Sequence, residues 1–125
     1  MDDFRDYNTN FGHQEGDAVI QFVAGILQRE LKGFVGRNGG DEFVFGYAGD
    51  LDKSEIETVI SRILKELNKN YISPRTKKLM PVPCSIGIVS ARGDTFDYAN
   101  LIQKADEAMY RAKEAGKNTF YIMEL

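Results

Sequence analysis

A glycine-rich turn followed directly by two acids is the feature that most restricts how this chain folds. The turn is Asn-Gly-Gly at residues 38–40, and Asp41 and Glu42 follow it. Because Asn-Gly is a strong hairpin signal, the apolar stretches at 34–38 and 42–47 are predicted to be paired strands. Two glycines let the backbone approach a bulky ligand, and adjacent carboxylates are the oxygen ligands that Mg2+ prefers. The pattern therefore indicates a sheet end that can hold a metal-bound phosphate.

Amphipathic helices and further strands flank this hairpin. Apolar residues recur at helical spacing in several segments, and Ser54 with Glu57 matches a capping box at the start of one of them. The expected helices cover residues 3–8, 15–31, 54–67 and 98–114, and further strands cover 82–90, which is expected to lie centrally in a sheet, and 119–123. This alternation predicts an α/β (α+β) fold with helices packed on a sheet. The length of 125 residues predicts a single domain over residues 1–125.

Composition excludes few classes of protein. The net charge of -3 argues against a general nucleic-acid binder, which needs a basic face. Cys84 is the single cysteine, so no internal disulfide forms, and a reducing compartment is expected. No apolar run approaches the roughly 20 residues of a membrane span. We expect a cytoplasmic domain without direct membrane contact, either free or as the cytoplasmic part of a membrane-anchored protein.

Four separated stretches of the chain resemble the GGDEF domains, the diguanylate cyclase family. The matching stretches are residues 2–8 with 12–17, residues 37–43, residues 85–88, and residues 105–113 with 116–118. They occur in the family's order and span nearly the whole chain. The resemblance implies a mixed sheet of the nucleotidyl-cyclase and polymerase-palm type, flanked by helices.

The implied activity joins two GTP molecules into the second messenger cyclic di-GMP and releases pyrophosphate. The family uses Mg2+ or Mn2+, works as a homodimer with one GTP in each domain, and usually has a sensor domain upstream. An alternative is a non-catalytic GGDEF module that binds GTP and regulates an attached domain. A plain scaffold with a solvated acidic hairpin requires four coincidences and is disfavoured.

Catalytic roles fall, by resemblance, on the turn and its acids. Asp41 is implied as a metal ligand that helps to deprotonate the attacking hydroxyl, and Glu42 as a second carboxylate for the metal. Two metal ions in such a site stabilise the attacking and leaving oxygens together. Gly39 and Gly40 leave room for the nucleotide. In an arbitrary hairpin these residues would be solvated acids and turn glycines.

Base recognition is implied for Asn8 and Asp17. A carboxylate accepts hydrogen bonds from the N1-H and amino groups of guanine, and adenine has no such donor pair, so Asp17 favours GTP over ATP. His13, the single histidine, is interpreted as structural.

Phosphate contacts are implied at two places. Helix starts present N-H groups and a positive dipole end to anions. The implied contacts are the backbone of Asp3, Phe4 and Arg5 and the side chains of Lys113 and Lys117. The family more often has Arg where Lys117 stands, so the charge is kept but the bidentate fork is lost.

Two departures from the family pattern are expected to matter. Many members bind product through Arg-x-x-Asp before the signature, but Glu30 and Gly33 occupy those positions, which predicts no binding of product there. The family's first metal-binding Asp and its strand have no counterpart before Asp2. We therefore expect an N-terminally truncated domain with weak or no activity. The alternative is a sheet completed in another way, for example by strand exchange or edge pairing with a second copy.

Overall fold

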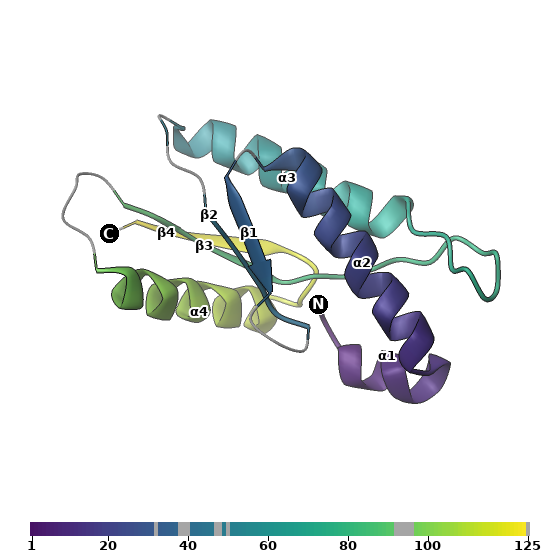
Figure 1. Ribbon diagram of the computed structural model, residues 1–125. Coiled ribbons are helices and arrows are strands. Elements are labelled where there is room, and N and C mark those ends of the chain that lie inside the picture. Colours follow the sequence, from purple (N-terminus) through teal and green to yellow (C-terminus); the bar gives the residue numbers. More distant parts are fainter. Residues whose placement is uncertain (32, 38–40, 47–48, 50, 92–96, 125) are drawn as a thin grey trace. The chain divides into compact units, whose positions relative to one another are not determined.

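The computed structural model describes residues 1–31, 33–37, 41–46, 49, 51–91 and 97–124 (Figure 1). The elements in order are α1 (Phe4–Phe11), α2 (His13–Glu30), β1 (Phe34–Arg37), β2 (Phe43–Gly46), α3 (Lys53–Lys69), β3 (Ile86–Ser90), α4 (Tyr98–Glu114) and β4 (Phe120–Glu124). The chain divides into two compact units. The first holds Asp3–Val82 with Met1, and the second holds Pro83–Leu125 with Asp2.

Helices α2 and α3 lie side by side and supply the core of the first unit (Figure 1). The predicted apolar face of α2 is buried apart from Phe22, which is half-buried, and Ile20 is buried in addition. On α3, the buried side chains are Ile60, Ile63 and Leu67. Both helices therefore bury apolar residues at the predicted helical spacing, although Ile56, Val59 and Leu64 of the predicted α3 face are only half-buried.

The start of α3 differs from the prediction. Asp52, not Ser54, is the N-cap, and its side chain accepts a 2.8 Å hydrogen bond from the backbone N-H of Glu55. The capping box assigned to Ser54 and Glu57 is therefore wrong. An Asp two residues earlier satisfies a free N-H of the first turn equally well and lets the helix begin at Lys53.

The predicted hairpin is confirmed in the first unit. Strands β1 and β2 pair antiparallel, with Val35 opposite Phe45 and Arg37 opposite Phe43. β2 begins one residue later than predicted, since Glu42 lies outside it, and the predicted strand residues Asn38 and Tyr47 lie outside the described residues. Gly39 and Gly40, which were predicted to leave space for a nucleotide, lie outside the described residues.

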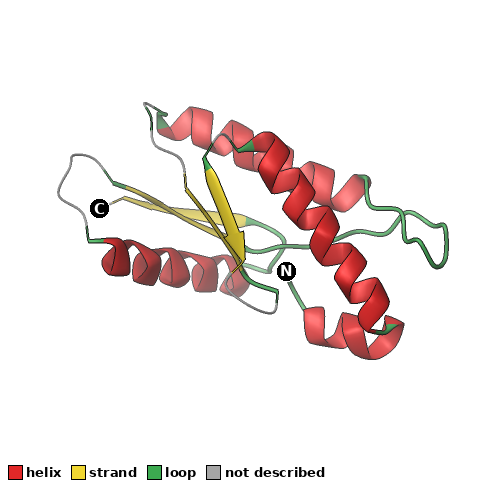
Figure 2. Ribbon diagram, in the orientation of Figure 1, coloured by secondary structure: helices red, strands yellow, loops and turns green. Residues whose placement is uncertain are grey.

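In the second unit, α4 packs on the parallel pair β3 and β4 (Figure 2). Ala108 and Ala112 are fully buried on α4. A Cβ atom on Gly87 of β3 would overlap the backbone of Ala105 and Met109, so helix and strand approach too closely for any side chain. The central position predicted for this strand is wrong within the described residues, because β3 pairs there with β4 alone and four of its five residues are only half-buried.

Asp2 is a buried clamp in the second unit. Its backbone N-H donates to the Pro83 carbonyl at 2.9 Å. One carboxylate oxygen accepts from Ser85 Oγ at 2.6 Å and the other from the backbone N-H of Asn118 at 2.9 Å. Both carboxylate oxygens of Asp2 are thus hydrogen-bonded within the protein, and they join the segment before β3 to the turn after α4.

The described residues form a mixed α/β structure in which small sheets are flanked by helices, as predicted. Within this part of the chain, no helix is both long and apolar enough to span a bilayer.

Candidate functional site

An open surface hollow of about 470 Å³ in the first unit brings together residues from three parts of the chain. Its lining consists of Phe4, Arg5, Asn8, Thr9, His13 and Asp41. Phe4, Arg5, Asn8 and Asp41 were predicted as site residues, whereas Thr9 was not, and His13 was interpreted as structural. His13 is exposed at the first position of α2, directly after Gly12. Its place at the start of a helix is the sequence signal that could have identified it as a site residue.

The N-terminus of α1 lacks a hydrogen bond from its backbone N-H groups to a capping side chain. Asp3 is its N-cap, with φ 57° and ψ 33°, a left-handed conformation that non-glycine residues rarely adopt. The side chain of Asp3 does not accept a capping hydrogen bond from this helix. The positive end of the α1 dipole is therefore left for an acceptor other than the Asp3 carboxylate.

Asn8 packs directly against Gly16. A Cβ atom at Gly16 would overlap Asn8 Oδ1 and lie 3.3 Å from the Phe4 ring, so only glycine permits this contact. Asn8 Oδ1 is buried, and no described residue supplies it with a hydrogen bond. An unpaired buried amide oxygen costs about 1–3 kcal/mol and calls for an explanation. Asn8 also lines the adjoining hollow.

Asp17 follows Gly16 in the first turns of α2 and is exposed. The structure thus brings the two predicted base-reading residues, Asn8 and Asp17, to the same corner between α1 and α2. Asp17 does not line the hollow itself.

Asp41 is half-buried in the hollow, and Glu42 beside it is exposed. The amino group of Met1 donates to the Asp41 backbone carbonyl at 3.2 Å, which places the opening segment beside the predicted metal ligands. No group of three or more acidic, histidine or cysteine side chains within the described ranges is arranged to hold a metal ion. Two adjacent carboxylates still fit Mg2+, which often takes one or two carboxylates and completes its shell with water and substrate phosphates.

Glu15 is a buried acid at the same corner that sequence patterns did not single out. Its carboxylate accepts hydrogen bonds from Tyr7, Tyr71, Ser73 and the backbone of Arg75. The hydrogen bond from Ser73 does most to lower its pKa, against the opposing effect of burial, and those from Arg75 and Tyr71 lower it further.

The pKa values of Tyr7 and Tyr71 are raised, in the opposite direction to the pKa of Glu15. Burial, followed by the charge of Glu15, raises the pKa of the Tyr7 hydroxyl. Burial is also the main reason that the pKa of Tyr71 is raised, with the neighbouring Tyr7 and Glu15 adding to it. Both hydroxyls therefore stay protonated and donate to the carboxylate.

Lys113 and Lys117 lie in the second unit at the C-terminal end of α4, and both are exposed. Lys117 has φ 63°, and its N-H donates to the Ala112 carbonyl at 3.2 Å. Gly116 precedes it with φ 119°, a backbone conformation that glycine adopts readily after the end of a helix. Of the two predicted phosphate contacts, Lys113 therefore lies in the last turn of α4 and Lys117 lies just after the helix ends.

Comparison with known proteins identifies the family. The sequence model described as "Diguanylate cyclase, GGDEF domain" matches residues 1–119. This chain belongs to the GGDEF domain family. Among curated relatives, it is 28% identical over 121 residues to a diguanylate cyclase of Vibrio cholerae, covering 94% of this chain and 36% of that protein. It is 31% identical over 120 residues to diguanylate cyclase DosC of Escherichia coli K12, covering 94% of this chain and 26% of the relative.

This GGDEF chain therefore spans about a quarter to a third of the length of these curated relatives. Among solved structures, the active GGEEF domain of a diguanylate cyclase from Vibrio cholerae superposes with a TM-score of 0.76 at 25% identity. That match covers 97% of this chain and 76% of the other. The predicted family and its nucleotidyl-cyclase, palm-like fold class are confirmed.

Proposed function

We propose that this domain condenses two GTP molecules into cyclic di-GMP and releases pyrophosphate, as a diguanylate cyclase. The observation that carries the proposal is the hollow of the first unit, where Phe4, Arg5, Asn8 and Asp41 meet. These residues come from two of the stretches that resemble the family, and the relatives named above are diguanylate cyclases. Residues 1–125 act in this proposal as one GGDEF domain.

Asn8 and Asp17 recognise the guanine base. The buried amide oxygen of Asn8, to which no described residue donates a hydrogen bond, supports this role. Asp17 is exposed close by, with a carboxylate suited to the N1-H and amino groups of guanine. A site built on such hydrogen bonds rejects adenine, because the wrong base leaves polar groups unpaired.

Phosphate binding rests on backbone N-H groups and positive side chains. The uncapped start of α1, at Asp3, Phe4 and Arg5, offers its positive dipole end. Lys113 and Lys117, at the end of α4, supply charge for the terminal phosphates.

Asp41 and Glu42 would hold Mg2+ or Mn2+, which when bound polarises phosphate oxygens and neutralises their charge. Asp41 also accepts the proton of the ribose 3′-hydroxyl. The 3′-oxygen of one GTP then forms a bond to the α-phosphorus of the other, and the bond from that phosphorus to pyrophosphate breaks. The same step with the roles of the two nucleotides exchanged forms the second bond, closes the ring and releases a second pyrophosphate. Because each domain holds one GTP, two copies of the chain face each other during the reaction.

A regulatory GTP-binding module is the second candidate. It is favoured by one observation, that no three-ligand acidic cluster occurs among the described residues. Both candidates require GTP, which favours a cytoplasmic location, and both are compatible with an upstream sensor domain in a longer protein.

Metal-dependent release of pyrophosphate from GTP distinguishes the two candidates. The cyclase releases pyrophosphate with Mg2+, and Asp41→Asn abolishes release while GTP still binds. Glu57→Gln, an acid-to-amide change at an exposed position of α3, is the matched control and leaves the rate unchanged. GTP binding without any pyrophosphate release by the parent protein would favour the regulatory module.

A further inference from the structure

Glu15 is a buried charge to which the proposed chemistry gives no task. It is 5% exposed and lies in the first turn of α2, between His13 and Asp17. Burying a carboxylate is costly unless hydrogen bonds replace its hydration. An acid retained at such a position therefore points to a role for the bonds it makes.

Four donors converge on this carboxylate. Oε1 accepts from Ser73 Oγ at 2.7 Å and from the backbone N-H of Arg75 at 2.9 Å. Oε2 accepts from Tyr71 at 3.2 Å and more weakly from Tyr7 at 3.5 Å. Three of the four donors come from residues 71–75, which follow α3, and the fourth comes from α1.

The same segment has further contacts with α1 and α2. Arg75 Nη1 donates to the Phe11 carbonyl at the end of α1 at 3.3 Å. The ring of Tyr71 packs against Phe22 of α2, with centroids 5.0 Å apart. Ser73, fully buried, also accepts from the backbone N-H of Thr76 at 3.2 Å, which closes the turn above Glu15.

These contacts reach the proposed base-reading residues through covalent neighbours. Tyr7 precedes Asn8 in α1, and Glu15 precedes Gly16, the residue on which Asn8 packs. Asp17 is two positions further along α2. Asn8 and Gly16 are in such close contact that neither can approach the other further. A shift at the corner between α1 and α2 therefore moves Asn8 relative to Asp17.

We propose that Glu15 is a positioning residue for the nucleotide base: by fixing residues 71–76 against the corner between α1 and α2, it holds Asn8 and Asp17 in register for guanine. This inference rests on the proposed function, since it assumes that these two residues read the base. It assigns a specificity role to a segment that contributes no residue to the hollow.

Binding of GTP and ATP to the parent and to Glu15→Gln tests the proposal. Gln keeps the shape and presents one oxygen to Ser73 and Arg75, but its amide group donates to hydroxyls that must then accept. We expect affinity for GTP to fall roughly tenfold, the size of one charge-assisted hydrogen bond, with ATP affinity unchanged. In turnover, KM for GTP rises and kcat at saturating GTP stays within about twofold.

Ser73→Ala and Tyr71→Phe, which each remove one donor, are expected to lower the GTP:ATP ratio by a smaller factor and cover the case in which Glu15→Gln fails to fold. Glu57→Gln is the surface control. A ratio within twofold of the parent in folded variants, even with a lower melting temperature, would reduce Glu15 to a structural residue and overturn the inference. If the parent itself shows no preference for GTP, the proposed function fails first, and this inference fails with it.

Discussion

The amide oxygen of Asn8 lies directly against Gly16, where a single additional carbon atom would overlap it. That contact joins α1 to the first turn of α2 and buries the amide oxygen of Asn8, a residue that lines the same hollow as Asp41. The position of one glycine thus decides whether Asn8 occupies its present place. The nucleotide site proposed above depends on it.

Gly16→Ala should displace Asn8 and weaken GTP binding by roughly tenfold or more, because a site that reads polar groups loses most when one is misplaced. Overpacking should also cost about 1–3 kcal/mol of unfolding free energy. Gly25→Ala is the control in the same helix, since its Cβ would meet no atom within 4 Å. It should stabilise the protein by about 0.5–1 kcal/mol. Unchanged GTP affinity in folded Gly16→Ala would count against Asn8 as a base-reading residue.

Gly87→Ala should destabilise the second unit. Its Cβ would overlap backbone atoms of Ala105 and Met109, which cannot rotate away as a side chain can, so α4 must move off β3. We expect a loss of about 1–3 kcal/mol or more, measured by urea unfolding. Gly36→Ala in β1, whose nearest neighbour would be the Val44 carbonyl at 3.9 Å, should change the midpoint little. Equal midpoints for both variants would contradict the close packing of α4 on β3.

The stability of the protein should fall in acid partly because of Glu15. Its folded pKa lies below the ordinary value of 4.5, chiefly because of the bond from Ser73. The stabilisation is therefore complete above about pH 4.5 and is lost as the pH falls through the folded pKa. Urea unfolding should be measured between about pH 6 and about pH 3, which spans that value. The free energy of unfolding should decline less steeply with falling pH for Glu15→Gln than for the parent. Identical pH profiles would show that this carboxylate is not the group responsible.

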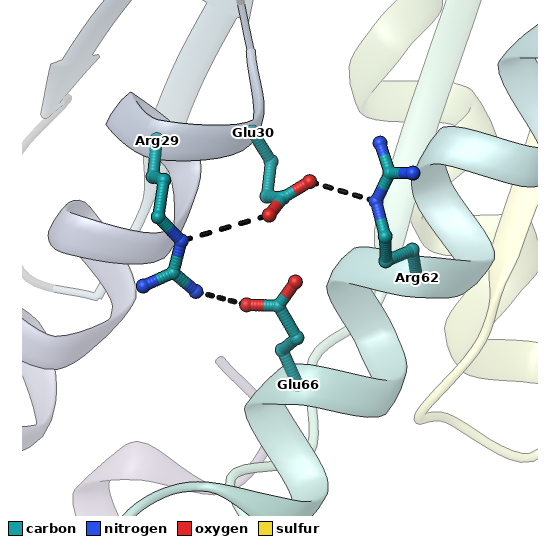
Figure 3. Close-up of polar contacts among 4 residues, drawn as sticks. All are labelled: Arg29, Glu30, Arg62 and Glu66. Carbon is teal, nitrogen blue, oxygen red and sulfur yellow. Dashed lines mark hydrogen bonds and ion pairs between the residues drawn. The ribbon is translucent and has the colours of Figure 1, made fainter.

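Product should not bind at the position of the family's inhibitory arginine. Glu30 stands there and pairs with Arg62 Nε at 2.7 Å, while Arg29 pairs with both Glu30 and Glu66 (Figure 3). The carboxylates neutralise the nearby guanidinium groups and repel phosphate. Calorimetric titration with cyclic di-GMP should show no binding at micromolar levels, whereas the double variant Glu30→Arg and Gly33→Asp should gain it. Micromolar binding by the parent that is lost on mutating Glu30 would refute the prediction.

Local sequence patterns predicted the helices and strands better than the tertiary contacts that these elements make. The periodicity of residues 98–114 predicted α4 with the observed bounds, and Asn-Gly predicted the hairpin. The cap of α3 was misplaced because Asp52 and Ser54 are chemically similar caps two residues apart. The Glu15 cluster could not be predicted, because its donors Tyr71 and Ser73 follow it by 56 and 58 residues and no local spacing relates them. Likewise, the clamp between Asp2 and Ser85 depends on tertiary packing alone.

For the site, resemblance supplied Asn8 and Asp41, which line one hollow, and the structure added His13 and Thr9 to its lining. Phe4 and Arg5 were assigned through their backbone, and the uncapped start of α1 supports that reading. The roles of all these residues stay predictions until a nucleotide is bound.

The most direct test of the account is to identify the product formed from GTP and Mg2+ by chromatography and mass spectrometry, at several concentrations of the protein. We predict cyclic di-GMP and pyrophosphate, with a rate per chain that rises with protein concentration because two copies must meet, and no product from Asp41→Asn. GTP bound at every concentration without any cyclic di-GMP would contradict the cyclase and leave the regulatory module as the function of this domain.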